Sequence, residues 1–248
     1  MTQSPIIKDD IWKNEALSKT FLSGVRGAIP LASEQIEVML RIISKARPQL
    51  ENFLDLGCGD GILGRAILGK YPQATGVFLD FSEPMLQAAK SQVSTQQGHQ
   101  FLLADFGNPK WTDRLKTDAP FDAIVSGFAI HHQPDNLKKE IYGSIYQLLK
   151  PGGIFLNLEH VSSATEWVGQ LQDNLFIDSL YQFQQQQGSQ KSREEIAREY
   201  YYRPDKAANI LAPVETQCHW LRELGFQHVD CYLKLFELAL FGGIRPES

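Results

Sequence analysis

The sequence predicts an α/β fold with a mostly parallel, seven-stranded sheet and helices on both faces. Two observations predict it. Short apolar segments alternate with helical patterns between about residues 50 and 160, and the first such segment breaks into a helix across three glycines at alternate positions. Alternation of this kind is typical of a parallel sheet, because each helix returns the chain to the same end of the sheet.

The composition fits a folded chain with one α/β domain and room for an insertion. Of the 248 residues, 43% are hydrophobic and 21% are charged, so the chain can bury a substantial core. The net charge of −5 and the isoelectric point of about 5.7 argue against a large phosphate-binding face. Because no Lys/Arg-rich run is present either, we do not expect a nucleic-acid partner.

The sequence indicates neither a membrane protein nor a secreted one. No apolar run approaches the ~18 residues that a bilayer requires, and residues 1–10 lack the apolar core of a signal peptide. The three cysteines, Cys58, Cys218 and Cys231, fit neither a metal motif nor a disulfide framework. We therefore expect a cytoplasmic protein, and a homodimer is left open.

The N-terminal segment is predicted to be helical and to precede the sheet. Residues 15–25 have a weakly helical pattern, which residues 26–30 interrupt. Ser33 then stands where a cap is expected for a helix over residues 34–46, whose apolar side chains share one face.

A glycine-rich turn follows a short buried strand over residues 53–56. Gly57, Gly59 and Gly61 allow the backbone to turn sharply and to approach a ligand, because glycine lacks Cβ and tolerates a positive φ. A helical pattern begins at residue 62. This arrangement is typical of a nucleotide pocket. The spacing differs from the dinucleotide motif Gly-x-Gly-x-x-Gly, and a tight turn without a ligand is the alternative.

The next two predicted strands each lead to an acid. The second strand covers residues 74–80 and ends at Asp80, whose carboxylate can accept hydrogen bonds from the two hydroxyls of a ribose. The third strand, over residues 100–103, leads into Asp105 and Phe106. A carboxylate accepts from an N–H donor and an aromatic ring offers an apolar face, although such an acid is also often a helix cap.

Two adjacent histidines follow the fourth predicted strand, which covers residues 121–126. His131 and His132 do not resemble a metal site, because adjacent side chains point different ways and no nearby cysteine or carboxylate completes the geometry. A structural role for both rings and a role of His131 as a substrate contact or base are the alternatives. A helix over residues 135–148 and a fifth strand over residues 154–158 complete the alternation.

The regular alternation ends after the fifth strand. Residues 161–212 have irregular helical patterning with many aromatic side chains, and we expect a helical cap there, with one charged helix over residues 192–201. A last helix over residues 213–224 and two strands over residues 228–235 and 238–242 follow.

Five motifs in this order resemble the class I S-adenosylmethionine-dependent methyltransferases. They are DLGCG at residues 55–59, GVFLD at 76–80, LADF at 103–106, FDAIVS at 121–126 and LKPGG at 149–153. The resemblance implies a Rossmann-like sheet whose last strand inserts antiparallel. It also implies S-adenosyl-L-methionine as the cofactor, with these candidate cofactor-binding residues: Asp55, Gly57, Cys58, Gly59, Asp80, Phe81, Met85, Asp105, Phe106 and Ser126.

The resemblance further implies a small-molecule methyl acceptor beneath the cap. His131 is the candidate catalytic residue, and the candidate substrate-binding residues are Arg26, His132, Tyr200 and Arg203. Ordinary packing is the alternative for each of them. Methyl transfer from a sulfonium mainly requires the acceptor and the methyl group to be held in line, so we expect no metal and no catalytic triad.

We expect the 248-residue chain to be a single methyltransferase domain with four parts: N-terminal helices over residues 1–48, a cofactor-binding core over 49–160, the cap over 161–212, and a last helix and hairpin over 213–248. Two other functions are considered. The layout also resembles the carboxy-S-adenosylmethionine synthases of tRNA wobble-uridine modification, in which Arg203 would hold the added carboxylate. The other is a cofactor-binding protein without turnover.

Overall fold

All seven predicted strands are present in one sheet. The computed structural model describes residues 26–93, 98–202 and 208–247, and its strands follow the order β3-β2-β1-β4-β5-β7-β6. Their bounds are β1 Asn52–Leu56, β2 Thr75–Asp80, β3 Gln100–Leu103, β4 Phe121–Gly127, β5 Leu149–His160, β6 Gln227–Leu235 and β7 Leu238–Ile244.

The sheet is parallel over its first five strands and antiparallel at its C-terminal edge. β1 pairs with both β2 and β4, and β7 inserts antiparallel between β5 and β6. The strand order reverses between β1 and β4, so the crevice outside their carboxyl ends is the point where such sheets bind ligands. The mostly parallel sheet with an antiparallel C-terminal hairpin is confirmed.

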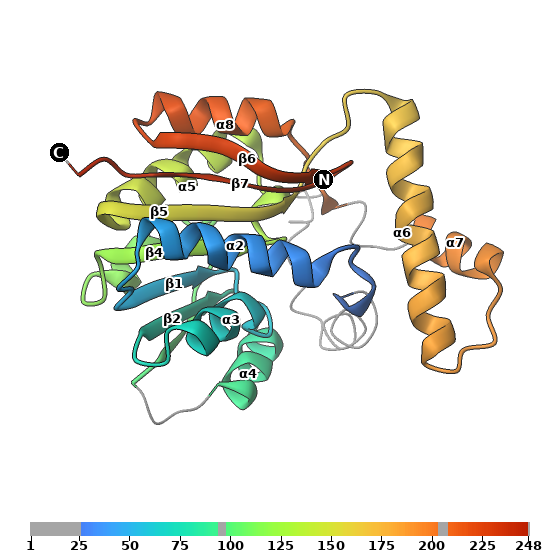
Figure 1. The fold of residues 1–248 in the computed structure, drawn as a ribbon, viewed down its shortest axis with the longest axis horizontal. Helices are drawn as coiled ribbons and strands as arrows, with labels where there is room; N and C mark the ends of the chain where they lie inside the picture. The colour runs from blue at the N-terminus through green and yellow to red at the C-terminus, as the bar shows by residue number, and fades with distance from the viewer. Residues whose placement is uncertain (1–25, 94–97, 203–207, 248) are drawn as a thin grey trace, which may run out of the picture.

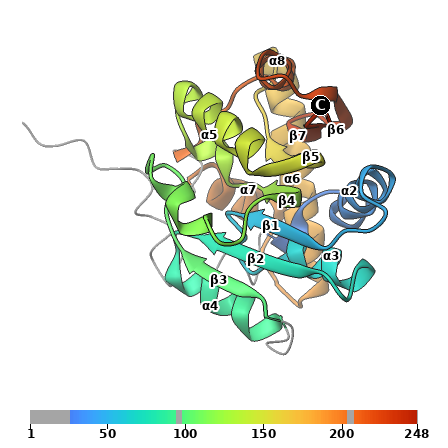
Figure 2. The same ribbon diagram turned by 90° about the vertical axis from the view of Figure 1, so that its left-hand side faces the viewer.

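Helices cover both faces of the sheet, and each face has its own apolar core. α2 (Ala32–Ala46), α3 (Ile62–Lys70) and α4 (Glu83–Gln92) pack on one face. α5 (Asp135–Leu148) and α8 (Val214–Glu223) pack on the other; Figure 2 shows the two groups on opposite sides of the strands. Both faces of the inner strands are therefore buried, as their almost uninterrupted apolar sequences require.

Two further helices form a cap beyond the carboxyl ends of the strands (Figure 1). They are α6 (Glu166–Gln186) and α7 (Arg193–Tyr201), which pack on each other around a third apolar cluster. The Ser192 side chain accepts a hydrogen bond from the backbone N–H of Glu195, and the Glu195 carboxylate accepts from that of Ser192, so this capping box fixes the start of α7. The short 3-10 turn Arg26–Ala28 also contacts α6.

The structure moves several predicted boundaries, since β5 covers Leu149–His160 instead of 154–158, and it adds 3-10 helices after β3 and after β4. Ser33 does not cap α2: the helix begins at Ala32, after Leu31 in a left-handed conformation (φ 56°). The Ser33 hydroxyl donates to Glu34 instead. A 3-10 helix at Trp111–Leu115 was not predicted. No helix in the described part of the chain is long and apolar enough to span a bilayer.

A buried carboxylate at the start of β4 ties three segments together at the amino ends of the strands, opposite the cap. Asp122 accepts hydrogen bonds from the backbone N–H groups of Glu51 (2.9 Å) and Asn52 (3.2 Å), from Lys150 Nζ (3.0 Å) and from Arg47. Burial by itself raises the pKa of Asp122, but these bonds outweigh it and hold the pKa below its usual range. The ionised form therefore stabilises the fold.

We expect Asp122→Ala to lower the free energy of unfolding by about 2–3 kcal/mol, because it leaves two cations and two backbone N–H groups without their acceptor. Because the folded pKa is depressed, this contribution is present above the unfolded pKa and is lost as the pH falls through the folded value. Urea denaturation at neutral and acidic pH measures both effects.

The control for this prediction is Arg41→Ala, which removes an exposed pair with Glu37 on α2. It should change the stability by less than about 0.5 kcal/mol, because water screens such pairs. Equal effects of Arg41→Ala and Asp122→Ala would contradict the role assigned to Asp122.

Candidate active site

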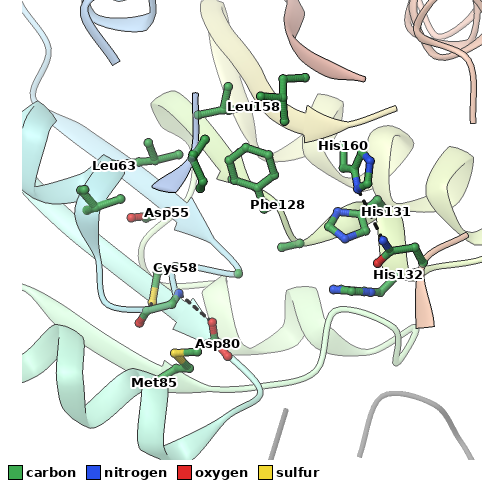
Figure 3. Close-up of a pocket in the computed structure, with 18 of the residues that line it drawn as sticks. Asp55, Cys58, Leu63, Asp80, Met85, Phe128, His131, His132, Leu158 and His160 are labelled. Atoms are coloured by element: carbon green, nitrogen blue, oxygen red, sulfur yellow. Dashed lines mark hydrogen bonds between the residues drawn. The ribbon is translucent and has the colours of Figure 1, made fainter. Parts of the chain in front are cut away.

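A cavity of about 210 Å³ lies at the carboxyl ends of β1, β2, β4 and β5, between the sheet and the cap. Figure 3 shows two ends. One end is formed by the glycine turn, Asp80 and Met85, and the other by three histidines from the region after β4 and the end of β5. Leu63, Phe128 and Leu158 form apolar walls between them. One continuous cavity therefore has a polar end at the switch point and an imidazole-rich end.

The glycine turn closes tightly because Gly57 lacks a side chain. Gly57 has φ +68°, and a Cβ built there would lie 2.4 Å from the Cβ of Ala129. The backbone N–H groups of Gly57 and Cys58 both donate to Leu79 O, at 2.8 and 3.0 Å. Asp55 Oδ2 accepts from the backbone N–H of Gly64 (2.8 Å) and so fixes the start of α3. The predicted turn is thus built by backbone contacts that a larger residue at position 57 would break.

Asp80 is held at the cavity wall by the same turn. Its Oδ2 accepts from the Gly59 N–H and its Oδ1 from the Ser82 N–H, both at 2.8 Å. Burial raises the pKa of Asp80 to about 6, and the backbone hydrogen bonds offset part of that rise. A carboxylate has about four acceptor positions. The backbone donors Gly59, Phe81 and Ser82 therefore leave Asp80 with acceptor capacity for a ligand in the cavity.

Most of the other candidate cofactor-binding residues also line this end of the cavity, namely Asp55, Gly57, Cys58, Gly59, Phe81, Met85, Asp105 and Phe106. The carboxylate of Asp105 accepts from the Gly107 N–H at 2.7 Å. Burial raises the pKa of Cys58 well above its usual value, so its thiol stays neutral and is not a nucleophile.

Of the candidate cofactor-binding residues, Ser126 alone does not line the cavity. Its hydroxyl is buried and donates to Leu56 O at 2.8 Å, which ties β4 to β1. The structure therefore gives Ser126 a contact within the sheet.

The other end of the cavity contains three imidazoles. The ring centroids of His131 and His132 lie 4.0 Å apart, and those of His131 and His160 lie 5.8 Å apart. All three residues line the cavity (Figure 3). His160 Nε2 lies 2.8 Å from Glu237 Oε2, and His132 Nδ1 lies 3.5 Å from Ala208 O. Each ring is thus held by different partners.

The buried carboxylate of Glu159 holds His131 at two points. Glu159 Oε1 lies 2.5 Å from His131 Nδ1, and Oε2 accepts from the His131 backbone N–H at 3.1 Å. The backbone N–H of His160 (3.0 Å) and Asn157 Nδ2 (3.3 Å) also donate to Glu159. Burial raises the pKa of Glu159 to about 7, and these donors and the neighbouring imidazoles oppose that rise.

Tyr200, a predicted substrate-binding residue on α7, lines the cavity, and two neighbouring side chains fix the position of its ring. Its hydroxyl donates to Asp173 (2.9 Å) and its ring stacks on Phe176 (5.5 Å between centroids). The Arg26 side chain and Arg203 lie outside the described residues. In the described part of the chain, no three histidine, cysteine, aspartate or glutamate side chains are arranged so that they could hold a metal ion.

Several residues of the site escaped the sequence analysis. Glu159 lies beside the cavity, one residue before the end of β5, and an acid near the end of a strand is the signal that found Asp80. Gln35 on α2 and Asn209 carry no such signal, because only the tertiary fold brings them to the cavity. Phe128 has a left-handed φ of 52°, rare for an aromatic residue; Figure 3 shows its ring between the two ends of the cavity. Backbone strain of this kind gathers at functional sites.

Known proteins match this chain either over about half of its length or from end to end. A model of the methyltransferase domain matches residues 54–155. Demethylmenaquinone methyltransferase of Leptospira interrogans is 32% identical over 50% of this chain and 49% of its own length. Carboxy-S-adenosyl-L-methionine synthase of Desulfotalea psychrophila is 23% identical over 99% of this chain and 96% of its own. The chain thus spans about half of the first relative and almost all of the second.

The solved structures agree with the fold. Human N-acetylserotonin methyltransferase, in complex with S-adenosylmethionine, superposes with a TM-score of 0.62 at 16% identity, over 99% of this chain and 60% of its own. The matched methyltransferase domain covers the strands that build the glycine-turn end of the cavity. The chain thus contains a match to a methyltransferase domain over residues 54–155, and its fold is that of S-adenosylmethionine-dependent methyltransferases of known structure.

Proposed function

We propose that this protein transfers a methyl group from S-adenosylmethionine to a small-molecule acceptor. The observation that carries the proposal is the two-ended cavity, in which Asp80 and the glycine turn at one end face three imidazoles at the other. S-adenosylmethionine, when bound, supplies a methyl group on a positively charged sulfur. The cavity's apolar walls exclude water and can hold an acceptor in line with that methyl group.

The residues present fit this cofactor. Asp80 can accept from the ribose hydroxyls. Because Gly57 and Gly59 carry no side chain, the backbone of the turn can lie close to the cofactor. Asp105 offers an acceptor for the adenine amino group and Phe106 an apolar face for the ring.

An unpaired acceptor on α2 supports the same fit. Gln35 is fully buried and lines the cavity; its Nε2 donates to Pro30 O (2.7 Å), whereas its Oε1 has no hydrogen-bond partner in the described part of the chain. A buried acceptor without a partner costs about 1–3 kcal/mol. The cofactor carries an ammonium group, which can donate to this oxygen, so we assign Gln35 to the cofactor's amino acid end.

A second candidate function is the synthesis of carboxy-S-adenosylmethionine. The observation that favours it is the end-to-end similarity to the Desulfotalea psychrophila synthase, since the methyltransferase relatives match only about half of the chain. This chemistry needs a cation for the added carboxylate. Arg203, the candidate for that role, lies outside the described residues, and we rank methyl transfer first.

The first test of the proposal is the affinity for S-adenosylhomocysteine, measured by calorimetry. Gly57→Ala should weaken binding by roughly tenfold or more, because the added methyl group meets Ala129 and forces the turn open. Gly98→Ala is the matched control: Gly98 also has a positive φ (+71°), but a Cβ there meets nothing within 4 Å. Equal affinities for the two variants would count against the glycine turn as a cofactor site.

The same affinity should depend on pH through Asp80. Hydroxyl donors bind the ionised carboxylate, and its pKa is about 6, so we expect binding to weaken as the pH falls below that value, by at most about tenfold per pH unit. Asp80→Asn should bind more weakly at neutral pH and lose this transition. An unchanged pH dependence in Asp80→Asn would exclude Asp80 as its source.

Mass spectrometry of the ligand that copurifies with the protein separates the two candidate functions. A methyltransferase should retain S-adenosylmethionine or S-adenosylhomocysteine. A retained species heavier by one carboxyl group would instead favour the synthase function.

A further inference from the structure

We propose that Gln172, on α6 of the cap, is a specificity-determining residue that donates a hydrogen bond from its amide Nε2 to a carbonyl oxygen of the methyl acceptor. The acceptor is then a neutral molecule with a ketone, ester or amide group on an apolar body. This inference rests on the proposed methyl transfer and names its acceptor class. Its starting point is a buried, cavity-lining amide that uses only its oxygen within the described residues.

The backbone of Glu237 fixes which end of the Gln172 amide faces the cavity. Gln172 is only 2% exposed and lines the cavity. Its Oε1 accepts from the backbone N–H of Glu237 at 3.4 Å, and this is its one hydrogen bond to the part of the chain that the structure describes. Because a backbone N–H can only donate, the carbonyl end of the amide must turn toward Glu237. Nε2 is therefore left for a molecule in the cavity, since a buried donor without a partner is costly.

The side chain of Glu237 gives this end of the cavity a negative charge. Its Oε1 accepts from Ser163 Oγ at 2.6 Å, and its Oε2 lies 2.8 Å from His160 Nε2. Burial by itself raises the pKa of Glu237, but the hydrogen bonds from His160 and Ser163 outweigh it and hold the pKa below its usual value. Glu237 is therefore ionised at neutral pH, and it disfavours an acceptor with a carboxylate at this place.

The amide of Asn209 offers a second donor at the same end of the cavity. The Glu237 carboxylate can only accept, so a neutral His160 ring carries its proton on Nε2. His160 Nδ1 is then an acceptor, and it lies 3.4 Å from Asn209 Nδ2. This contact uses one of the two N–H bonds of the Asn209 amide and leaves the other. Asn209, His160 and Gln172 all line the cavity.

The backbone next to Asn209 is held on both sides. The N–H of Ile210 donates to His131 O at 2.9 Å, and the carbonyl oxygen of Ile210 accepts from Nζ of the buried Lys138. Lys138 is itself paired with Asp135 at 2.7 Å. Asn209 therefore sits in an anchored segment, and selective recognition requires a contact group that is fixed in this way.

The wall beside Gln172 is aromatic. Phe176 lies one helical turn further along α6, so its side chain shares a face with that of Gln172. The Phe176 ring stacks on Tyr200 of α7, with centroids 5.5 Å apart and planes at 30°, and both residues line the cavity. An apolar body, above all a flat one, can pack on this wall while its polar group meets the amide.

A carbonyl group matches these surroundings better than other polar groups do. Its oxygen has two lone pairs and no proton, so it can accept from amide N–H donors. A carboxylate would meet the negative charge of Glu237. A hydroxyl group can accept too, but its own proton then needs a further acceptor. A hydrocarbon would leave the Gln172 donor unpaired.

The experiment compares four probe molecules that share a benzene ring: acetophenone, 1-phenylethanol, benzoate and ethylbenzene. Their affinities for the full-length protein saturated with S-adenosylhomocysteine are measured by NMR titration. Gln172→Met keeps the length of the side chain and removes the donor. We expect it to weaken acetophenone relative to ethylbenzene by about three- to tenfold, which corresponds to the loss of one neutral hydrogen bond. The loss should be smaller for 1-phenylethanol, and benzoate should bind more weakly than acetophenone to the wild type.

The matched control is Gln170→Met, the same change two residues earlier on α6. Gln170 is exposed, does not line the cavity and contacts only Glu166, at 3.5 Å, among the described residues. This control should leave all four affinities unchanged. Both variants should bind S-adenosylhomocysteine as tightly as the wild type, which shows that the cavity is intact. Gln172→Leu is the second variant if Gln172→Met does not fold.

The carbonyl stretching band of 13C-labelled acetophenone reports the hydrogen bond directly. A hydrogen bond to the oxygen lowers the frequency of this band. For the bound probe, it should lie below its position in cyclohexane with the wild type and with Gln170→Met, and should move up with Gln172→Met. A wild-type band at the cyclohexane position would overturn the inference, whatever the variants do.

The outcomes separate this inference from the proposal beneath it. Equal relative affinities in the wild type and Gln172→Met would show that water satisfies Nε2, and would overturn the inference while methyl transfer stands. Failure of acetophenone to bind, or a loss at least as large for 1-phenylethanol, would also overturn it. No binding of S-adenosylhomocysteine by the wild type would overturn the proposed function itself.

Discussion

The cavity depends on the close approach of the turn after β1 to the loop after β4. Gly57 permits it, because a Cβ there would lie 2.4 Å from the Cβ of Ala129. Ala129 is only two residues before His131, so the same contact sets the distance between the glycine turn and the histidines. A larger side chain at position 57 would separate the two ends of the cavity as well as disturb the turn.

The features that sequence reasoning found share a local cause. A positive φ, a strand that ends in an acid and the alternation of apolar segments each depend on a few neighbouring residues, so Gly57, Asp80 and the succession of strands along the chain were predictable. The 3-10 turn at Trp111–Leu115 has no strong local pattern and was missed. Ser33 failed as a cap because the chain enters α2 through a left-handed Leu31 instead, which the preferences of cap residues do not anticipate.

Which side chains of the site meet one another depends on the tertiary fold. Glu159 and His131 are 28 residues apart and meet only because β4 and β5 are parallel neighbours with their carboxyl ends together. Gln35 reaches the cavity because α2 packs beside α3 on the sheet. Ser126 shows the converse: the family motif selects it, but its hydroxyl is used within the sheet. A motif thus identifies the strand end better than it identifies which side chain faces the cavity.

The cap has its own apolar cluster, which includes Phe176, Ile196 and Tyr200 and is separate from the two clusters that hold the sheet. Phe176 and Tyr200 also line the cavity. Replacement of side chains in α6 and α7 can therefore reshape one wall while the strands keep their packing. In evolution, such a modular arrangement lets descendants of one ancestor acquire new chemical preferences by drift in two helices, with little risk to folding.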